Sequence, residues 1–260
     1  MSNYSLTAII DSNIFNNLDE FSDELSLCHA LEIRYDLFSD QSIWPELSSI
    51  IRKKFPMMEL IGTIRFESDG GSYPNKLNEQ RLELWQQILH DSHKLNWVDI
   101  ECEYFEDIMM INNFSKNKPV KIILSKHNFN KMTCESDLEF MVNTARQMNT
   151  DGLKLATTAK SEKDEFTLYS LILNHSRDFL NFSFFSMTKE YQRTRVLSAL
   201  ICDSHSFVYG YLDKACAPGQ FKISQLNKIL DNAQIKHPEG YEALDDYVLD
   251  DLNNTIKEFS

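Results

Sequence analysis

The sequence predicts an α/β protein folded as a (β/α)8 TIM barrel, and three observations favour that fold class. Eight short apolar runs of strand length alternate with longer segments whose apolar residues recur at helical spacing, which is typical of parallel strands joined by crossover helices. The chain has 260 residues, close to the usual length of one closed barrel. No GxGxxG or GxxxxGK loop follows any run, which argues against the alternative, an open doubly wound sheet.

The eight apolar runs are the predicted strands, and most are bounded by polar, Gly or Asn residues. In chain order they are Leu6–Ile10, Ala30–Tyr35, Glu59–Ile64, Trp97–Glu101, Val120–Ser125, Gly152–Ala156, Leu180–Phe185 and Phe207–Leu212. In a parallel barrel the chemistry gathers at the C-terminal ends of the strands. The polar residues that end these runs are therefore the candidates for function.

Helical spacing of apolar residues predicts helices between the strands. These segments include Gln80–His90, Asp137–Met148, Glu165–Leu173, Lys189–Leu200 and, closing the barrel, Ser224–Leu230. We assign residues 1–232 to a single barrel domain and residues 233–260 to an acidic C-terminal extension. In that extension apolar residues recur at roughly helical spacing, which predicts an extra amphipathic helix packed on the barrel. Those residues are Tyr241, Leu244, Val248, Leu249 and Leu252.

Composition narrows the classes of function. The formal net charge of −13 argues against a nucleic-acid partner, because phosphate binding needs a basic surface. Five cysteines without a CxxC pair indicate free thiols in a reducing compartment. The first residues lack the basic and apolar regions of a signal peptide, and no apolar run approaches the length of a membrane span. We therefore expect a cytoplasmic protein that acts on a small molecule, without a membrane partner.

Charged residues end two of the predicted strands. Alternation places Glu32 and Arg34 on one side of the second strand, with Asp36 just beyond, and gives Asp99 and Glu101 one face of the fourth. Charged side chains that face a barrel interior cost energy unless they are paired or functional. A buried ion pair at the barrel mouth is an equally good interpretation of Glu32 and Arg34.

Three further strands carry candidates. Arg65 ends the third strand and Asp69 begins an Asp-Gly-Gly turn, although a plain surface loop has the same signature. His127 continues the alternation of the fifth strand and should face the mouth, where a histidine is more often functional than elsewhere. Lys154 lies inside the otherwise apolar strand DGLKLA. Lysine is rarely buried without a reason, and burial among apolar neighbours favours the uncharged, nucleophilic amine, so we interpret Lys154 as catalytic.

Seven segments in register make the chain resemble the type I 3-dehydroquinate dehydratases over about Ala30 to Leu230. They are ALEIRYDL, TIRFESDGG, VDIE, IILSKHNF, DGLKLA, FSMTKEYQRTR and YGYLDKACAPGQ. The resemblance implies a (β/α)8 barrel that dehydrates 3-dehydroquinate to 3-dehydroshikimate, in the shikimate pathway towards chorismate and the aromatic amino acids. It implies that no metal or diffusible cofactor is required, and it favours a homodimer.

The resemblance also assigns roles by motif position. Lys154 would form a Schiff base with the substrate ketone, His127 would act as general acid and base, and Asp69 would orient His127. Substrate contacts would come from Glu32, Arg34, Arg65, Met187, Arg195 and Gln220.

The chain departs from the family pattern at several positions. Asp69 stands where the family usually has glutamate, and Cys216 replaces a commonly polar residue before APGQ. Tyr191 and Thr194 stand where glycine and serine are common. The substrate-binding residue of the first strand is not placed by the motifs, and Asp11 and Ser12 are the candidates.

Two alternative functions remain open from the sequence. Another Schiff-base barrel enzyme, such as a class I aldolase, would share Lys154 but not the combination of His127 and APGQ. An inactive homologue that binds partners through its acidic tail would have no need of Lys154 and His127.

Overall fold

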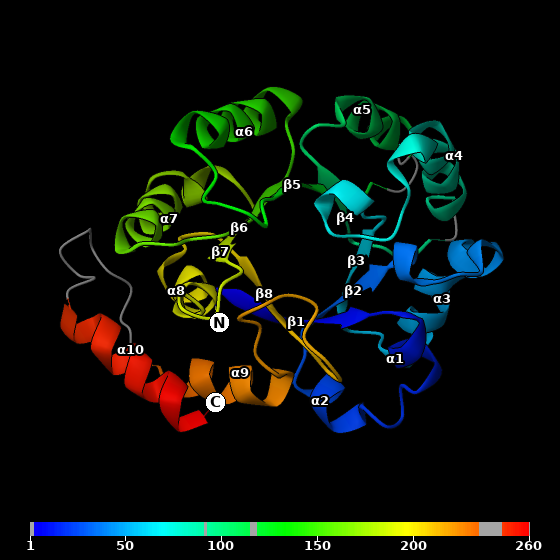
Figure 1. The fold of residues 1–260 in the computed structure, drawn as a ribbon. Helices are drawn as coiled ribbons and strands as arrows, with labels where there is room; N and C mark the ends of the chain where they lie inside the picture. The colour runs from blue at the N-terminus through cyan, green and yellow to red at the C-terminus, as the bar shows by residue number, and fades with distance from the viewer. Residues whose placement is uncertain (1–2, 91–92, 115–118, 234–245, 260) are drawn as a thin grey trace.

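The computed structural model describes residues 3–90, 93–114, 119–233 and 246–259, and it forms a barrel of parallel strands surrounded by helices (Figure 1). The strands are β1 Tyr4–Ile10, β2 Ala30–Arg34, β3 Glu59–Thr63, β4 Trp97–Glu101, β5 Lys121–His127, β6 Gly152–Thr157, β7 Asn181–Ser186 and β8 Ser206–Gly210. The helices are α1 Ser12–Asn16, α2 Ser22–Ser26, α3 Trp44–Lys54, α4 Asn78–Ile88, α5 Phe105–Phe114, α6 Glu135–Met148, α7 Glu162–His175, α8 Arg193–Ile201, α9 Ile223–Asn232 and α10 Asp246–Phe259.

The sheet curves until its two outer strands meet. Its order runs from β7 through β6, β5, β4, β3, β2 and β1 to β8. An isolated parallel bridge joins Asn181 to His205 at the seam between β7 and β8. There the Phe207 backbone N–H donates to the Ser183 hydroxyl at 2.9 Å, so a side chain takes the place of a ladder hydrogen bond. The predicted (β/α)8 barrel is therefore confirmed.

All eight predicted strands are present, and their ends differ from the predicted ones by no more than two residues. The helix predicted over Lys189–Leu200 begins only at Arg193. In the first turn of this helix, the Thr194 hydroxyl accepts from the Ser186 N–H and donates to the Tyr191 carbonyl, which holds the connection from β7 as a loop. Apolar spacing did not single out α3 and α5.

Alternation along the strands separates two cores. Outward residues such as Leu153 and Leu155 pack against the helices, and inward residues fill the barrel. At the N-terminal end of the barrel, the rings of Trp97 and Phe207 meet edge to face with centroids 5.5 Å apart. An aromatic layer therefore closes the floor beneath the charged side chains that follow along the same strands.

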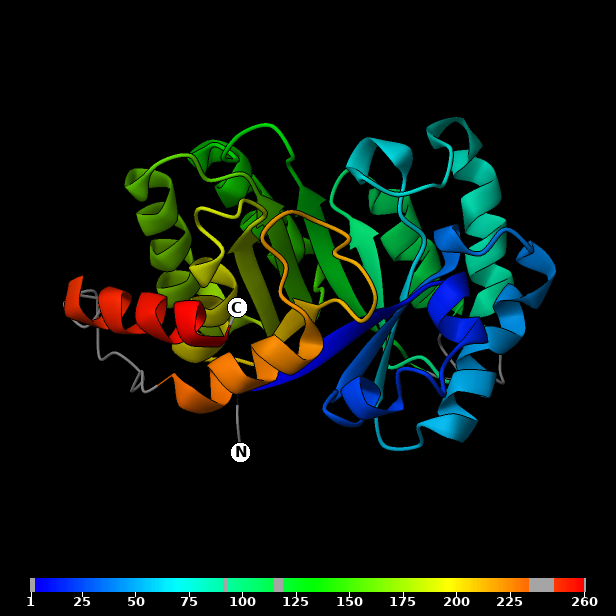
Figure 2. The same cartoon turned by 60° about the horizontal axis from the view of Figure 1, so that its bottom comes forward.

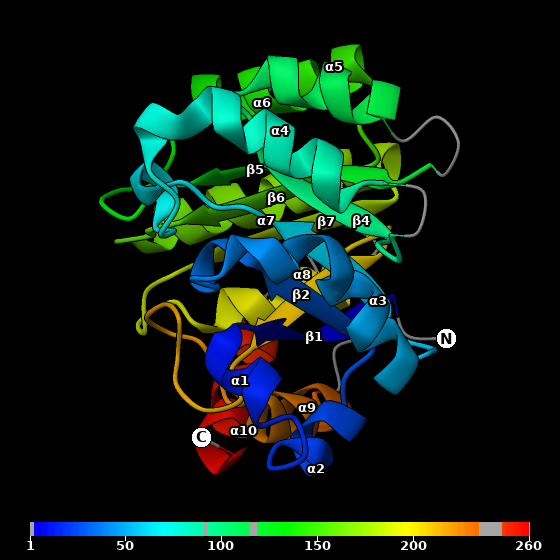
Figure 3. The ribbon, with the colours of Figure 1, turned by 90° about the vertical axis from the view of Figure 1, so that its right-hand side faces the viewer.

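The C-terminal helix α10 contacts α9 and α8, and Figure 2 shows it lying alongside α9. Leu249, Leu252 and Ile256 are buried, which confirms the predicted extra helix on the barrel. Figure 3 shows α4, α5 and α6 on the opposite side of the strands from α9 and α10. Tyr241 and Leu244 lie outside the described residues, and the domain boundary after residue 232 stays a prediction.

None of the helices in the described ranges combines the length and the apolar character needed to cross a membrane.

Candidate active site

A pocket opens at the C-terminal ends of the strands and encloses about 580 Å³, including its mouth. That volume is in the range of small-molecule sites. Its lining contains every residue that the resemblance assigned to catalysis or substrate binding: Glu32, Arg34, Arg65, Asp69, His127, Lys154, Met187, Arg195 and Gln220. Four of the lining side chains are cationic and two are acidic, so this pocket reverses the negative balance of the whole chain.

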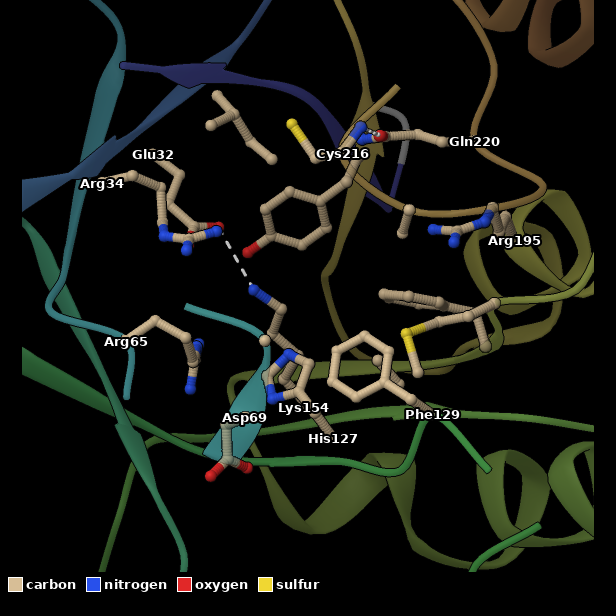
Figure 4. Close-up of a pocket in the computed structure, with 17 residues that line it drawn as sticks. Glu32, Arg34, Arg65, Asp69, His127, Phe129, Lys154, Arg195, Cys216 and Gln220 are labelled. Atoms are coloured by element: carbon tan, nitrogen blue, oxygen red, sulfur yellow. Dashed lines mark hydrogen bonds and ion pairs between the residues drawn. The ribbon is translucent and has the colours of Figure 1, made fainter. Parts of the chain in front are cut away.

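Lys154 lies on β6 and points into the barrel, where it meets two carboxylates. Its Nζ donates to Glu32 Oε2 at 3.1 Å and to Asp99 Oδ2 at 3.0 Å. Figure 4 shows the amine reaching towards Glu32 across the pocket. Nζ also lies 4.0 Å from the centroid of the Tyr209 ring. The expected apolar surroundings of Lys154 are therefore wrong, because the inward residues of the neighbouring strands are acidic.

Arg65 adds a second cation to the same cluster. Its guanidinium pairs with Asp99 at 2.7 Å and with Glu101 at 3.3 Å, and it donates to the Ser125 hydroxyl at 2.8 Å. Burial would lower the pKa of Arg65, but Asp99 and Glu101 outweigh it and raise that pKa. Burial would likewise raise the pKa of Asp99, but Arg65 and Lys154 hold it well below its usual range. We call Glu32, Arg65, Asp99, Glu101 and Lys154 the paired end of the pocket.

Arg34 takes its partner from its own strand end. It donates from Nε and from a terminal nitrogen to the two carboxylate oxygens of Asp36, at 2.9 and 2.8 Å. Asp36 also accepts from the backbone N–H groups of Arg65 and Ser72, so it ties Arg34 to the loop after β3. No hydrogen bond or ion pair joins Glu32 to Arg34 in the structure, and each pairs elsewhere. The predicted buried ion pair at the barrel mouth is therefore present, but it joins Arg34 to Asp36 and not to Glu32.

His127 ends β5 and faces the pocket, as the alternation predicts. Its ring stacks on Phe129 with centroids 6.3 Å apart, and its Nδ1 is buried without a hydrogen-bond partner among the described residues. Loss of hydration, followed by the charges of Arg65 and Lys154, holds the pKa of His127 well below its usual value. The imidazole is therefore uncharged at neutral pH and can accept a proton.

Asp69 lines the pocket but does not hold the imidazole in this structure. Its Oδ2 accepts a hydrogen bond from the Ser68 hydroxyl at 2.9 Å, and in Figure 4 its carboxylate points away from His127. Burial, together with Glu101, raises the pKa of Asp69. Asp69 thus makes no hydrogen bond to His127 here, and the expectation that it orients His127 stays a prediction.

Arg195 occupies the opposite side of the pocket, away from Glu32 and Arg34 (Figure 4). It is buried, its guanidinium lies 4.5 Å from the centroid of the Phe185 ring, and it donates to the Pro218 carbonyl at 3.3 Å. Its Nε has no hydrogen-bond partner, and no carboxylate pairs with it, in the part of the chain that the structure describes. Burial lowers the pKa of Arg195 to about 9. We call Arg195 the unpaired end of the pocket.

The loop after β8 covers the unpaired end. Gln220 accepts from the Cys216 N–H at 2.9 Å, which closes the loop on itself. Gly219 adopts φ +70°, and a Cβ atom there would lie 2.4 Å from the Thr188 carbonyl oxygen in the loop after β7. The two loops therefore touch backbone to backbone, and only glycine fits at the contact.

Sequence reasoning missed part of the site. Tyr209 lines the pocket and was not singled out, although alternation from the inward Phe207 predicts that it points inward. From the first strand the lining residue is Ile9. Asp11, proposed for that role, instead caps α1 by accepting from the Ile14 N–H at 2.8 Å, and Ser12 is the first residue of that helix.

Comparison with known proteins agrees with this geometry. The family model "Type I 3-dehydroquinase" matches residues 9–237. A catabolic 3-dehydroquinate dehydratase from Acinetobacter baylyi is 27% identical over 209 residues, 78% of this chain and 73% of the relative. A 3-dehydroquinate dehydratase from Methanococcus maripaludis is 26% identical over 223 residues, 85% of this chain and 96% of the relative.

The fold has solved counterparts. The crystal structure of 3-dehydroquinate dehydratase from Geobacillus kaustophilus superposes with a TM-score of 0.77 at 20% identity, covering 88% of this chain and 91% of the other. At that identity the likeness supports the fold alone. The match of the family model over most of the sequence goes further. The chain therefore belongs to the type I 3-dehydroquinase family and is an enzyme of the hydro-lyase class.

Proposed function

We propose that this enzyme dehydrates 3-dehydroquinate to 3-dehydroshikimate through a Schiff base on Lys154. One observation carries the proposal: a buried amine faces the same pocket as a buried guanidinium that pairs with no carboxylate among the described residues. Such a pocket suits a molecule that carries both a ketone and a carboxylate. The family match supports the same substrate and the shikimate pathway, and it favours this reaction over that of an aldolase.

In the proposed reaction, Lys154 attacks the C3 ketone, and loss of water leaves a protonated imine. The imine draws electrons from C2 and so acidifies its proton. His127 takes that proton and returns a proton to the C1 hydroxyl as it departs. The lowered pKa of His127 supports the first of these roles, because the imidazole must be uncharged to act as a base.

The remaining residues would bind and orient the substrate. Arg195 would pair with the substrate carboxylate, since a planar guanidinium matches a carboxylate with two parallel hydrogen bonds. The other polar and apolar contacts would come from Glu32, Arg34, Arg65, Met187 and Gln220, all of which line the pocket. Asp69 would orient His127 only after turning from Ser68.

Borohydride capture tests the proposal. Borohydride reduces an imine to a stable amine, so treatment in the presence of 3-dehydroquinate should add one substrate-derived mass, mapped by peptide fragmentation to Lys154. The Lys154→Met variant is the control and should add none. A folded wild-type protein that gives no adduct, or an adduct at another lysine, would refute the mechanism. An adduct with other ketones but not with 3-dehydroquinate would instead favour a different Schiff-base enzyme.

A further inference from the structure

Tyr209 is buried beside the reactive amine and is not used in the reaction described above. Its side chain comes from β8 and lines the pocket, with 4% of the residue exposed. The ring lies under Lys154 Nζ, 4.0 Å from its centroid. A phenylalanine would supply the same ring, so packing against Lys154 does not require the hydroxyl.

The Tyr209 hydroxyl interacts with the Glu32 carboxylate, but it makes no hydrogen bond of ordinary geometry within the described residues. Glu32 already accepts hydrogen bonds from Lys154 and Thr63, so a substrate oxygen in the pocket would give the Tyr209 hydroxyl a partner of its own. Burial, followed by the charges of Glu32 and Asp99, raises the pKa of this hydroxyl well above its usual value. The group therefore keeps its proton at neutral pH and is available as a donor.

We propose that the Tyr209 hydroxyl relays a proton from Lys154 to the ketone oxygen of the substrate when the carbinolamine forms. This inference rests on the proposed Schiff-base function and adds a catalytic residue to it. The oxygen of a carbinolamine is two bonds from Nζ, and Tyr209 contributes the ring against which Nζ packs. His127, which is assigned to the proton at C2, does not contact Nζ through any hydrogen bond in the structure.

Every proton that moves during imine formation has a donor and an acceptor. Lys154 first passes a proton to Glu32, to which it already donates a hydrogen bond. The free amine forms the N–C3 bond, and the carbonyl π electrons move to oxygen, which takes the proton of the Tyr209 hydroxyl. The phenolate then removes a proton from the newly cationic nitrogen. When the nitrogen lone pair expels the hydroxyl to give the imine, Glu32 returns its proton, and water leaves.

The test measures how fast the imine forms. Enzyme and 3-dehydroquinate are mixed, quenched with borohydride after increasing times, and the adduct on Lys154 is followed by intact mass. Tyr209→Phe should slow capture by at least about tenfold, as expected for a lost proton-transfer group, and should change the solvent deuterium isotope effect on capture. Its melting temperature should change little, because the variant keeps the buried ring and Glu32 keeps its hydrogen bonds from Lys154 and Thr63.

Tyr35→Phe is the matched control. Tyr35 is also buried, and its hydroxyl also lacks a hydrogen bond of ordinary length, but it packs between Trp44 and Trp85 outside the pocket. This variant should capture substrate at the wild-type rate. Wild-type capture by Tyr209→Phe would overturn the relay and leave the Schiff base intact. Absence of any adduct in the wild type would overturn both proposals.

Discussion

Both ends of the pocket hold buried cations, and the two ends differ in whether carboxylates pair with those cations. At the paired end, the cations Lys154 and Arg65 are held by Glu32, Asp99 and Glu101. At the unpaired end, Arg195 is also buried, but among the described residues it meets only a carbonyl and an aromatic ring. The cations of the paired end thus have carboxylate partners within the chain. No described carboxylate reaches Arg195, although a buried guanidinium needs an anion. Under the proposed function, one side of the pocket would therefore recognise the acid and the other would carry out the chemistry.

The largest effects that test this difference are expected when Lys154 and Arg195 are replaced in turn. Lys154→Met should abolish turnover, by more than about 1,000-fold, because no other residue supplies the imine. It should also lower the free energy of unfolding by about 3 kcal/mol, since it leaves Glu32 and part of Asp99 buried without their partner. Steady-state kinetics and urea denaturation measure the two effects.

Arg195→Met is the counterpart in the same experiment. It should lower kcat/KM by about 100-fold, the value of charge-assisted hydrogen bonds to a carboxylate, but leave the free energy of unfolding unchanged or higher. Borohydride should still capture substrate on Lys154 in this variant. Equal destabilisation by the two substitutions would contradict the division of the pocket into a paired and an unpaired end.

A second prediction concerns His127, which lies close to Lys154 in the pocket (Figure 4). His127→Ala should slow turnover by about 10²- to 10⁴-fold, the usual contribution of a general acid–base group. Because the C2 proton can no longer be removed, the Lys154 adduct should accumulate, and intact mass after borohydride treatment would reveal it. Rapid turnover without an adduct would exclude the proposed role of His127.

The smallest effect is expected in the pH dependence. It bears on the comparison because burial, followed by the cations of the paired end, lowers the pKa of His127. The imidazole acts as a base only when uncharged, which holds above its pKa. The kcat/KM of the free enzyme should therefore persist as pH falls through 6.5 and decline only at a lower pH.

Stability should follow the same group. Between pH 6.5 and the lowered pKa, the unfolded chain binds a proton that the folded chain does not, so acidification in that window should destabilise the fold. An NMR titration of the His127 ring would give its pKa directly. A value at or above 6.5 would contradict the combined effect of burial and of the paired-end cations on the imidazole.

Much of the site could be predicted because strand alternation fixes which side chains face inward. Lys154, His127 and Arg65 all lie where their strand positions require. The partners of Lys154 could not be predicted in the same way. Asp99 and Glu32 reach the amine from other strands, and which carboxylate meets which cation depends on curvature and register across the barrel. The sequence of β6 alone suggested an apolar environment for this reason.

Loop residues were predicted less well than strand residues. The motif located Asp69 in the pocket, but whether its short side chain reaches His127 depends on the conformation of the turn after β3. In the structure Ser68, its neighbour in sequence, accounts for its hydrogen bond instead. Asp11 shows the same limit, because a polar residue that follows a strand serves equally well as a helix cap.

The contact between Gly219 and Thr188 has a consequence for how such a pocket can be inherited or transplanted. Arg195 follows the loop after β7 and Gln220 belongs to the loop after β8, and the two loops touch where a Cβ atom would lie 2.4 Å from a carbonyl oxygen. A sequence change that reshapes one loop must be matched in the other. Recombination between related barrels would therefore preserve the proposed carboxylate-binding side of the pocket only when both loops descend from one parent, as they do when the breakpoints fall before β7 or after α9.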